Sequence, residues 1–170
     1  VNILESILEE QLAEVTELTM WHLNGVIDRV DLEVVPVIAN AMRDFRAVGL
    51  GVANLQGAFA YFQIPYESEA AIDFARAIFS TMRYHVLKAS CDAVAKYGVF
   101  KEFEDTTYAD GTHFNQYREE SFAPTTAKVQ GICTDYNIHV PTQEEWTALA
   151  ARIQVEGLAN AYQQAIAPTG

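Results

Sequence analysis

Histidines and carboxylates are the residues of this 170-residue chain that could ligate a metal, but their spacing is unfavourable. Carboxylate-bridged metal sites in helical bundles take Glu-x-x-His pairs from two helices and further glutamates from others. None of the four histidines, His22, His85, His113 and His139, has a glutamate three residues before it. Asp110 and His113 have an Asp-x-x-His spacing, but they lie in a stretch rich in turn residues. We therefore predict that the chain holds no metal.

The acidic residues and the thiols form no self-contained catalytic group either. Adjacent acids such as Glu144 and Glu145 point in different directions on a helix, so they are poor general acid and base partners. Cys91 and Cys133 show neither a CxxC nor a zinc spacing, and no histidine stands beside them. We expect both cysteines to be buried, reduced thiols, and we predict no catalytic residue in the chain.

Three glycines, Gly49, Gly51 and Gly57, raise the alternative of a nucleotide-binding loop. A dinucleotide fingerprint needs GxGxxG directly after a strand. Here Asn54 stands where the third glycine would be, and no convincing strand comes before it. We instead interpret the glycines as a tight turn or a close backbone approach that leads into a short apolar helix, residues 52–62.

A long helix is predicted over residues 68–97, and it is the element around which the others must pack. Ser68 offers a hydroxyl N-cap, no proline or glycine interrupts the helix, and Gly98 stands where a left-handed C-cap is expected. Such a helix is about 45 Å long. Its polar residues, Asp73 and Ser80 among them, form a narrow strip, and apolar residues cover the rest. We therefore expect it to be buried.

Shorter helices are predicted on both sides of the long one. Residues 2–24 have leucines at helical spacing, and residues 31–45 form a second helix in which Pro36 fits only the first turn. Residues 99–117 look like a structured loop that aromatic side chains hold in place. A helix follows over residues 125–136. The last helix begins with a capping box of Thr142 and Glu145 and ends at Gly157, before a short extended run.

Composition excludes several classes of protein. The net charge of -12 comes without a basic patch, which argues against nucleic-acid binding. No apolar run approaches the roughly 20 residues of a membrane span, and the first residues are acidic where a signal peptide is positive. With half its residues hydrophobic, the chain is predicted to be an ordered, mainly α, cytoplasmic protein with no membrane contact.

Ordered blocks of sequence resemble the large, catalytic alpha subunit of class I ribonucleotide reductase, especially the class Ib variety. The first is the glycine-rich run GLGVANLQG, which looks like a pattern of that family, and the last is the ending Ala-x-Ala-Pro-Thr-Gly. The blocks that carry the resemblance are residues 49–57, 66–71, 87–90, 108–111, 114–117, 126–129, 138–142, Trp146, Leu149, Gly157 and 165–170. Each block alone is unspecific, but together they match in order from about residue 46 to the end.

The resemblance implies a place in a larger fold. In that family the catalytic subunit is a ten-stranded α/β barrel, and this stretch is a largely helical connection between two of its strands. Residues 1–170 are then a single helical segment of the barrel domain. Its expected parts are N-terminal helices (1–45), the glycine-rich turn with the long helix (46–98), an aromatic loop (99–123), and C-terminal helices with the start of a phosphate loop (124–170).

The resemblance also implies a substrate site at the end of the chain. Pro168, Thr169 and Gly170 match the start of the loop whose backbone amides and hydroxyls hold the phosphates of a ribonucleoside diphosphate. Backbone amides at a loop that leads into a helix are a sound anion site. The Ser/Thr residues that follow in the family are not in this sequence.

Other implied components lie outside this chain. The family reduces ribonucleotides to deoxyribonucleotides with a thiyl radical on a cysteine in an N-x-C-x-E pattern, which this sequence lacks. The segment is therefore expected to be inactive alone and to need the remaining segments of the catalytic subunit. It would also need a small (beta) subunit with a dimetal radical centre, and nucleotide effectors would bind elsewhere. The alternative is a stand-alone helical protein-interaction module, in which Leu4, Leu8, Leu12 and the aromatic loop form a partner surface.

Overall fold

A computed structural model describes residues 6–14, 17 and 34–165 of the chain. Residues 6–14 are helical, and the predicted mainly α fold class is confirmed for the described residues. The elements that follow are α2 (Val34–Phe45), α3 (Leu55–Tyr61), α4 (Glu69–Tyr97), the 3₁₀ turns η1 (Phe103–Asp105) and η2 (Thr112–Phe114), α5 (Asn115–Glu119), α6 (Ala127–Asp135) and α7 (Gln143–Glu156).

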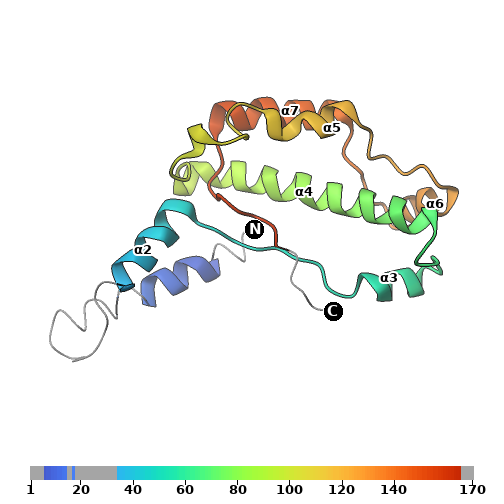
Figure 1. Cartoon of the computed structure of the whole chain (residues 1–170), viewed down its shortest axis with the longest axis horizontal. Coiled ribbons are helices and arrows are strands. Elements are labelled where there is room, and N and C mark those ends of the chain that lie inside the picture. The colour runs from blue at the N-terminus through green and yellow to red at the C-terminus, as the bar shows by residue number, and fades with distance from the viewer. Residues whose placement is uncertain (1–5, 15–16, 18–33, 166–170) are drawn as a thin grey trace.

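The long helix α4 is present as predicted and runs through the middle of the molecule (Figure 1). Its N-cap, Ser68, accepts a hydrogen bond from the backbone N–H of Ala71 at 3.2 Å. Gly98 at the other end has the expected positive φ of 78°, but its ψ of 177° is extended and not left-handed helical. The chain therefore leaves α4 in an extended direction, which only glycine adopts easily at this φ.

Two hydrophobic clusters lie along α4, one for each half of the helix. The N-terminal half contributes Ala71, Phe74 and Ala77 to a cluster that also holds α3 and α6. The C-terminal half contributes Leu87 and Cys91 to a cluster with the aromatic loop and α7. Because α4 belongs to both clusters, it joins two small cores that would otherwise be separate.

The last helix forms as predicted, whereas the predicted aromatic loop also contains η1, η2 and the start of α5, which were not predicted. Tyr117 of α5 stacks on Trp146 of α7 with ring centroids 3.9 Å apart and planes 15° apart, so aromatic side chains do hold this loop against the core. Thr142 and Glu145 form the predicted capping box at the start of α7, and Gly157 follows its last residue with a φ of 83°. Trp146, Leu149, Ala150 and Ile153 are all buried, as their spacing predicted.

Two extended segments lie against α4 on the side away from α5 and α7 (Figure 1). Leu50 and Gln164 form a parallel bridge. The backbone N–H of Val48 donates to the carbonyl of Tyr162 at 3.0 Å, and that of Ala165 donates to the carbonyl of Leu50 at 3.2 Å. The predicted extended run near the C-terminus is therefore confirmed up to residue 165, and it pairs with residues 48–50, more than a hundred positions away in sequence.

The glycine-rich stretch makes the close backbone approach that we predicted. A Cβ atom at Gly51 would overlap the carbonyl oxygen of Ala165, so no larger residue fits without a shift of the backbone. The predicted helix over 52–62 was too long at its start, because Asn54 is the N-cap of α3 with a φ of 63°. Its side chain accepts from the N–H of Gly57 at 3.1 Å, so the helix begins only at Leu55.

Other helix predictions agree in place and differ in length. α2 starts at Val34, which puts Pro36 in its first turn as expected. α6 begins at Ala127, two residues later than predicted, because Thr126 is its N-cap. Of the helix predicted over residues 2–24, the structure describes only 6–14 and 17, and these are helical. The remainder lies outside the described residues.

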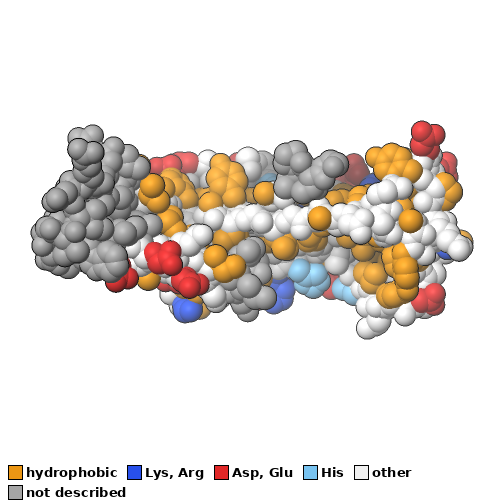
Figure 2. Space-filling model, turned by 90° about the horizontal axis from the view of Figure 1, so that it is seen from below, with side chains coloured by type: hydrophobic (Ala, Val, Ile, Leu, Met, Phe, Trp, Pro, Cys, Tyr) orange, Lys and Arg blue, Asp and Glu red, His pale blue; other side chains and the backbone are white. Residues whose placement is uncertain are grey.

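None of the helices in the described ranges is long and apolar enough to cross a bilayer. Hydrophobic side chains are scattered over the face in Figure 2 and gather toward the end of the molecule where α3 lies. Tyr61 and Tyr66, which are 73% and 69% exposed, belong to that end of the molecule.

The narrow polar strip predicted for α4 is partly wrong, because two of its residues are buried. Ser80 is 4% exposed and Asp73 is 8% exposed. The Asp73 carboxylate accepts the backbone N–H of Thr125 on both oxygens at 3.1 Å and that of Thr126 at 2.8 Å. It also accepts the Thr126 hydroxyl at 2.7 Å. Burial alone would raise the pKa of Asp73, but these hydrogen bonds outweigh it and hold the pKa below 3.8. Asp73 therefore fixes the start of α6 against α4.

We expect Asp73→Asn to lower the free energy of unfolding by about 1 to 3 kcal/mol at pH 7, because an amide cannot accept all of these hydrogen bonds. The native pKa is depressed, so the stabilisation is present above the unfolded pKa and is lost as the pH falls through the native pKa. Urea denaturation at several pH values measures the difference. The difference in the free energy of unfolding between the wild type and Asp73→Asn should persist at pH 5 and become smaller only below pH 3.8. The exposed Asp105→Asn serves as a control, and an equal effect of both variants would contradict this role for Asp73.

Candidate functional site

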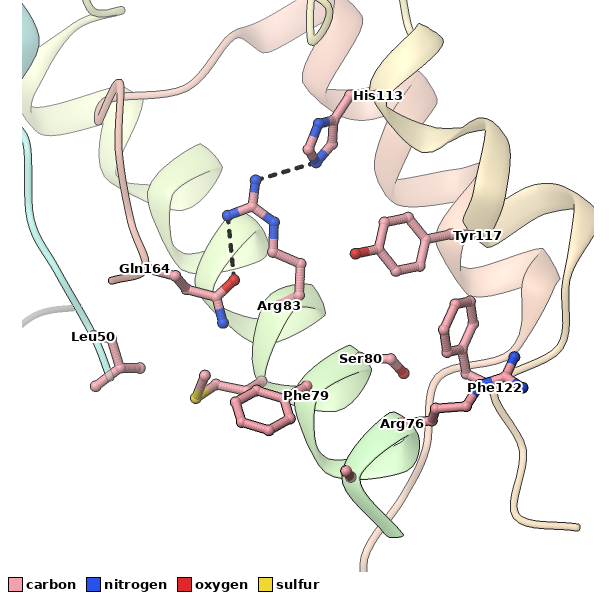
Figure 3. Close-up of a pocket in the computed structure, with 11 residues that line it drawn as sticks. Leu50, Arg76, Phe79, Ser80, Arg83, His113, Tyr117, Phe122 and Gln164 are labelled. Carbon is pink, nitrogen blue, oxygen red and sulfur yellow. Dashed lines mark hydrogen bonds between the residues drawn. The ribbon is translucent and has the colours of Figure 1, made fainter. Parts of the chain in front are cut away.

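A cavity of about 600 Å³ lies between α4, α5 and the extended run that contains Gln164 (Figure 3). Its walls are mostly apolar, with a few polar groups, which is typical of sites that bind small molecules or another segment of protein. The lining residues are Leu50, Ala75, Arg76, Phe79, Ser80, Met82, Arg83, His113, Tyr117, Phe122 and Gln164.

Arg83 is the polar centre of this cavity. Its Nη1 donates to Oε1 of Gln163 at 3.1 Å and to Oε1 of Gln164 at 3.3 Å. Its Nη2 donates to the hydroxyl of Tyr108 and lies 3.1 Å from Nε2 of His113. One guanidinium thus joins α4, the aromatic loop and the extended run, and the planar fork of arginine donors suits this use.

His113 is held neutral by its surroundings. Burial lowers the pKa of its imidazole most, and the nearby Arg83 charge lowers it further, to about 4. An arginine only donates hydrogen bonds, so Nε2 of His113 must be the acceptor and the ring proton must be on Nδ1. At neutral pH His113 is therefore a hydrogen-bond acceptor for Arg83 and not a cation.

The remaining polar groups of the cavity do not form a catalytic set. Arg76 is paired with Glu120 at 3.2 Å and lies over the ring of Phe122. The buried hydroxyl of Ser80 has no hydrogen-bond partner in the described part of the chain. Ser80 has no base within its contacts among those residues, so the cavity offers no activated nucleophile.

A second cavity, of about 610 Å³, lies between the end of α2, the start of the aromatic loop and Tyr162. Lys101 at its rim is paired with Asp44 at 3.1 Å. Thr106, another lining residue, donates its hydroxyl to the carbonyl of Phe103. Because these polar groups already bond to other groups of the protein, the second cavity is a weaker candidate for a ligand-binding site than the first.

Asp110 and His113, the pair with metal-ligand spacing, each have another partner. The Asp110 carboxylate accepts from the N–H and the hydroxyl of Thr112 at 2.8 and 2.7 Å, which is a local turn. His113 instead contacts Arg83. Within the described ranges, no three His, Cys, Asp or Glu side chains are grouped so as to hold a metal ion.

The cysteines are free thiols, and they differ in burial. Cys91 is buried, as predicted, and burial raises the pKa of its thiol to about 11. Cys133 is only partly buried, so the prediction was too strong for it, but burial still raises its pKa. Both thiols are therefore protonated at neutral pH and poor nucleophiles.

The predicted phosphate-binding residues Pro168, Thr169 and Gly170 lie outside the described residues. The described chain ends at Ala165, directly after Gln164 at the edge of the first cavity. Sequence reasoning missed the network around Arg83, because its partners come from segments 25 to 81 positions away. An arginine within a mostly apolar helix was the one available signal, since a buried charge requires partners.

Comparison with known proteins gives one consistent family. The sequence model of the family described as "Ribonucleotide reductase, barrel domain" matches residues 2–170. The chain is 40% identical over 163 residues to a ribonucleoside-diphosphate reductase subunit alpha of Mycoplasma genitalium, which covers 94% of this chain and 23% of the relative. The corresponding subunit of Bacillus subtilis is 31% identical over 170 residues, which covers 99% of this chain and 24% of the relative. The chain spans about a quarter of the length of these relatives.

We expect His113 to make stability fall as the solution becomes acidic. Its native pKa of about 4 lies below the ordinary value of 6.5, so between these values the unfolded chain binds a proton that the native chain does not. Between pH 7 and pH 4 the wild type should lose free energy of unfolding through this protonation. His113→Gln keeps a hydrogen-bond acceptor for Arg83, and its loss should be smaller by about 1 to 3 kcal/mol. Urea denaturation at both pH values measures it. The exposed His85→Gln should behave as the wild type, and an NMR titration midpoint near 6.5 for His113 would contradict the prediction.

Proposed function

The chain belongs to the ribonucleotide reductase family, within the barrel domain of its alpha subunits, and from this we propose that it is one segment of a ribonucleoside-diphosphate reductase. The proposed reaction converts ribonucleotides to deoxyribonucleotides by thiyl-radical chemistry. The segment would take part only when it is assembled with the rest of the alpha subunit, because its residues include no N-x-C-x-E pattern. Its own share is scaffold and the start of the substrate phosphate loop.

The observation that carries this proposal is the parallel pairing of residues 48–50 with residues 162–165. Two parallel segments need a crossover connection, and here the connection is the whole run of helices from α3 to α7. An α/β barrel is built from such units repeated around an axis. The pairing therefore supports the finer proposal that the segment supplies two neighbouring strands of a ten-stranded barrel together with their helical connection.

The position of the proposed phosphate loop agrees with that geometry. In parallel α/β folds, ligands bind outside the carboxyl ends of the strands. In the sequence, Pro168, Thr169 and Gly170 follow the run over residues 162–165 on its carboxyl side, within five residues. We assign to these three residues the first backbone amides, and the Thr169 hydroxyl, that hold the phosphates of a ribonucleoside diphosphate.

The other components belong outside this segment. The proposed radical comes from a small (beta) subunit that carries a dimetal centre, and nucleotide effectors bind elsewhere on the alpha subunit. Cys91 has no part in this chemistry, because a buried thiol with a pKa of about 11 serves as core packing. No cofactor is assigned to the segment itself.

The alternative of a stand-alone interaction module loses most of the surface that suggested it. Leu8 is 7% exposed, and Phe103 and Phe114 of the aromatic loop are 4% and 0% exposed, so these side chains form the interior and not a partner surface. Leu4 lies outside the described residues. Exposed tyrosines near α3 remain, but they give no particular partner.

We expect the chain alone to reduce no ribonucleotide and a reconstituted enzyme to do so. The chain would be mixed with the remaining segments of its alpha subunit, the beta subunit and a dithiol reductant, and deoxyribonucleotide formation would be measured by chromatography. Each component left out in turn serves as the control. Full activity of the other components without this chain would contradict the proposed function.

Within the reconstituted enzyme, Thr169→Val should raise the KM for a ribonucleoside diphosphate about 10-fold or more and leave kcat within about twofold. The reason is the loss of one hydrogen bond to a charged phosphate, worth about 1.5 to 3 kcal/mol. Thr169→Ser, which keeps the hydroxyl, is the matched control and should stay near the wild type. An unchanged KM for Thr169→Val would remove Thr169 from the phosphate site.

A further inference from the structure

The first cavity contains a positive charge that no carboxylate of the described ranges offsets. The two Nη nitrogens of the partly buried Arg83 donate only to neutral side chains, which are those of Gln163, Gln164, Tyr108 and His113. Arg76 lines the same cavity, but its charge is offset by Glu120 at 3.2 Å. A guanidinium that is partly withdrawn from water and has no counter-ion is a favourable place for an anion.

Three hydrogen-bond donors on the wall of this cavity have no acceptor within the described part of the chain. The four hydrogens on the Nη nitrogens of Arg83 are used, but no acceptor bonds to its Nε–H. Tyr117 packs against other rings, and its hydroxyl makes no hydrogen bond within the same ranges. The Ser80 hydroxyl is buried and has no partner there either. A buried polar group without a partner indicates a bound molecule that the described chain does not supply.

The three donors line one cavity from two helices. Ser80 is three residues before Arg83 on α4, which puts both side chains on one face of the helix. Figure 3 shows the Tyr117 side chain reaching from α5 with its hydroxyl directed toward Arg83. Ser80 is 4% exposed and Tyr117 is 8% exposed. An acceptor bound between them is therefore shielded from water, which strengthens hydrogen bonds to a charged group.

The rest of the cavity wall suits an apolar group. Its apolar lining includes Leu50, Phe79, Met82 and Phe122. A volume of about 600 Å³ is within the range of pockets that bind small molecules. A ligand that fits both parts of the cavity has one anionic end and an apolar body.

We propose that this cavity is a binding site for a small carboxylic acid with an apolar body. Its carboxylate accepts from Nε of Arg83 and from the hydroxyls of Ser80 and Tyr117, and its body lies against Phe79 and Met82. A carboxylate has about four lone-pair sites, which is enough for three donors. One guanidinium with a single open N–H matches one negative charge, which favours a carboxylate over a phosphate dianion. The site lies wholly within the described residues, so the inference goes beyond the proposed function and does not rest on it.

The first test titrates the full 170-residue chain with 3-phenylpropanoate and follows the backbone amides by NMR. Saturable shifts are expected at amides around the cavity, with a Kd of about 1 mM or below. The alcohol 3-phenylpropanol has the same body without the charge, and acetate has the charge without the body. Each should bind at least about tenfold more weakly than the acid, because each lacks one half of the interaction. Equal affinity for the acid and the alcohol, or no saturable shift with the acid, would overturn the proposal.

The second test removes the two hydroxyls singly. Tyr117→Phe keeps the ring that stacks on Trp146, and Ser80→Ala removes a hydroxyl that no group of the described chain uses. Each variant should weaken the binding of 3-phenylpropanoate about tenfold and leave the midpoint of urea unfolding near that of the wild type. A purely structural role for these hydroxyls predicts the reverse, a shifted midpoint with an unchanged Kd. An unchanged Kd in both variants would remove the hydroxyls from the site and overturn the proposal.

The arginines provide a matched pair of variants. Arg83→Met should abolish the preference for the acid over the alcohol, whereas Arg76→Met should keep it, because Arg76 already pairs with Glu120. If Arg83→Met does not fold, the two hydroxyl variants decide the question, since neither removes a hydrogen bond found within the described ranges. A preference that survives in a folded Arg83→Met variant would contradict the assigned role of Arg83.

A last titration uses the reconstituted alpha subunit and isothermal calorimetry. Binding of 3-phenylpropanoate that Tyr117→Phe weakens about tenfold would support the site in the assembled enzyme. No binding there would mean that neighbouring segments fill the cavity, and it would overturn the proposal for the assembly. The titration needs no turnover, so its outcome is separate from the success or failure of the proposed reaction.

Discussion

The backbone pairing between residues 48–50 and residues 162–165 is the constraint on which the rest of the structure depends. The pairing closes a loop of more than a hundred residues. Closing such a loop lowers the conformational entropy of the chain, and favourable contacts must offset this cost. A few hydrogen bonds between two short segments are too weak to hold that closure. The helices between them must therefore provide a platform to which both segments bind, and α4 is that platform.

Buried polar contacts give this platform its specificity. The Ser90 hydroxyl on α4 donates to Oδ1 of Asn160 at 2.6 Å, and the N–H of Asn160 donates back to Ser90 at 3.1 Å. Nδ2 of Asn160 donates to the carbonyl of Arg46, at the start of the other extended segment, at 2.8 Å. Three segments are thus joined by fully buried groups that tolerate little change in register, whereas apolar packing alone permits sliding.

Features set by neighbouring residues were predictable from sequence, and features set by distant ones were not. The caps of α4 and the capping box of α7 involve residues up to four positions apart, so the pattern Ser68 to Gly98 and the pair of Thr142 and Glu145 were sufficient. Asp73 looked like a surface residue because its partners, Thr125 and Thr126, come 52 and 53 positions later. The Arg83 network was invisible for the same reason. The cavity around Arg83 could therefore be found only from the fold. Residues 168–170 were predicted from the family resemblance alone.

The His113 imidazole and the Cys91 thiol are used within the fold, the first as a hydrogen-bond acceptor and the second in core packing. His113 is a neutral acceptor for Arg83 at neutral pH, and the buried Cys91 thiol is protonated. A catalytic group needs the opposite, a proton that moves near neutral pH or a nucleophile that is activated. Among the described residues, no further strand lies beside the paired segments 48–50 and 162–165, and an isolated pair of this size is marginally stable. This agrees with the barrel-domain family to which the chain belongs, since a barrel places further strands beside such a pair.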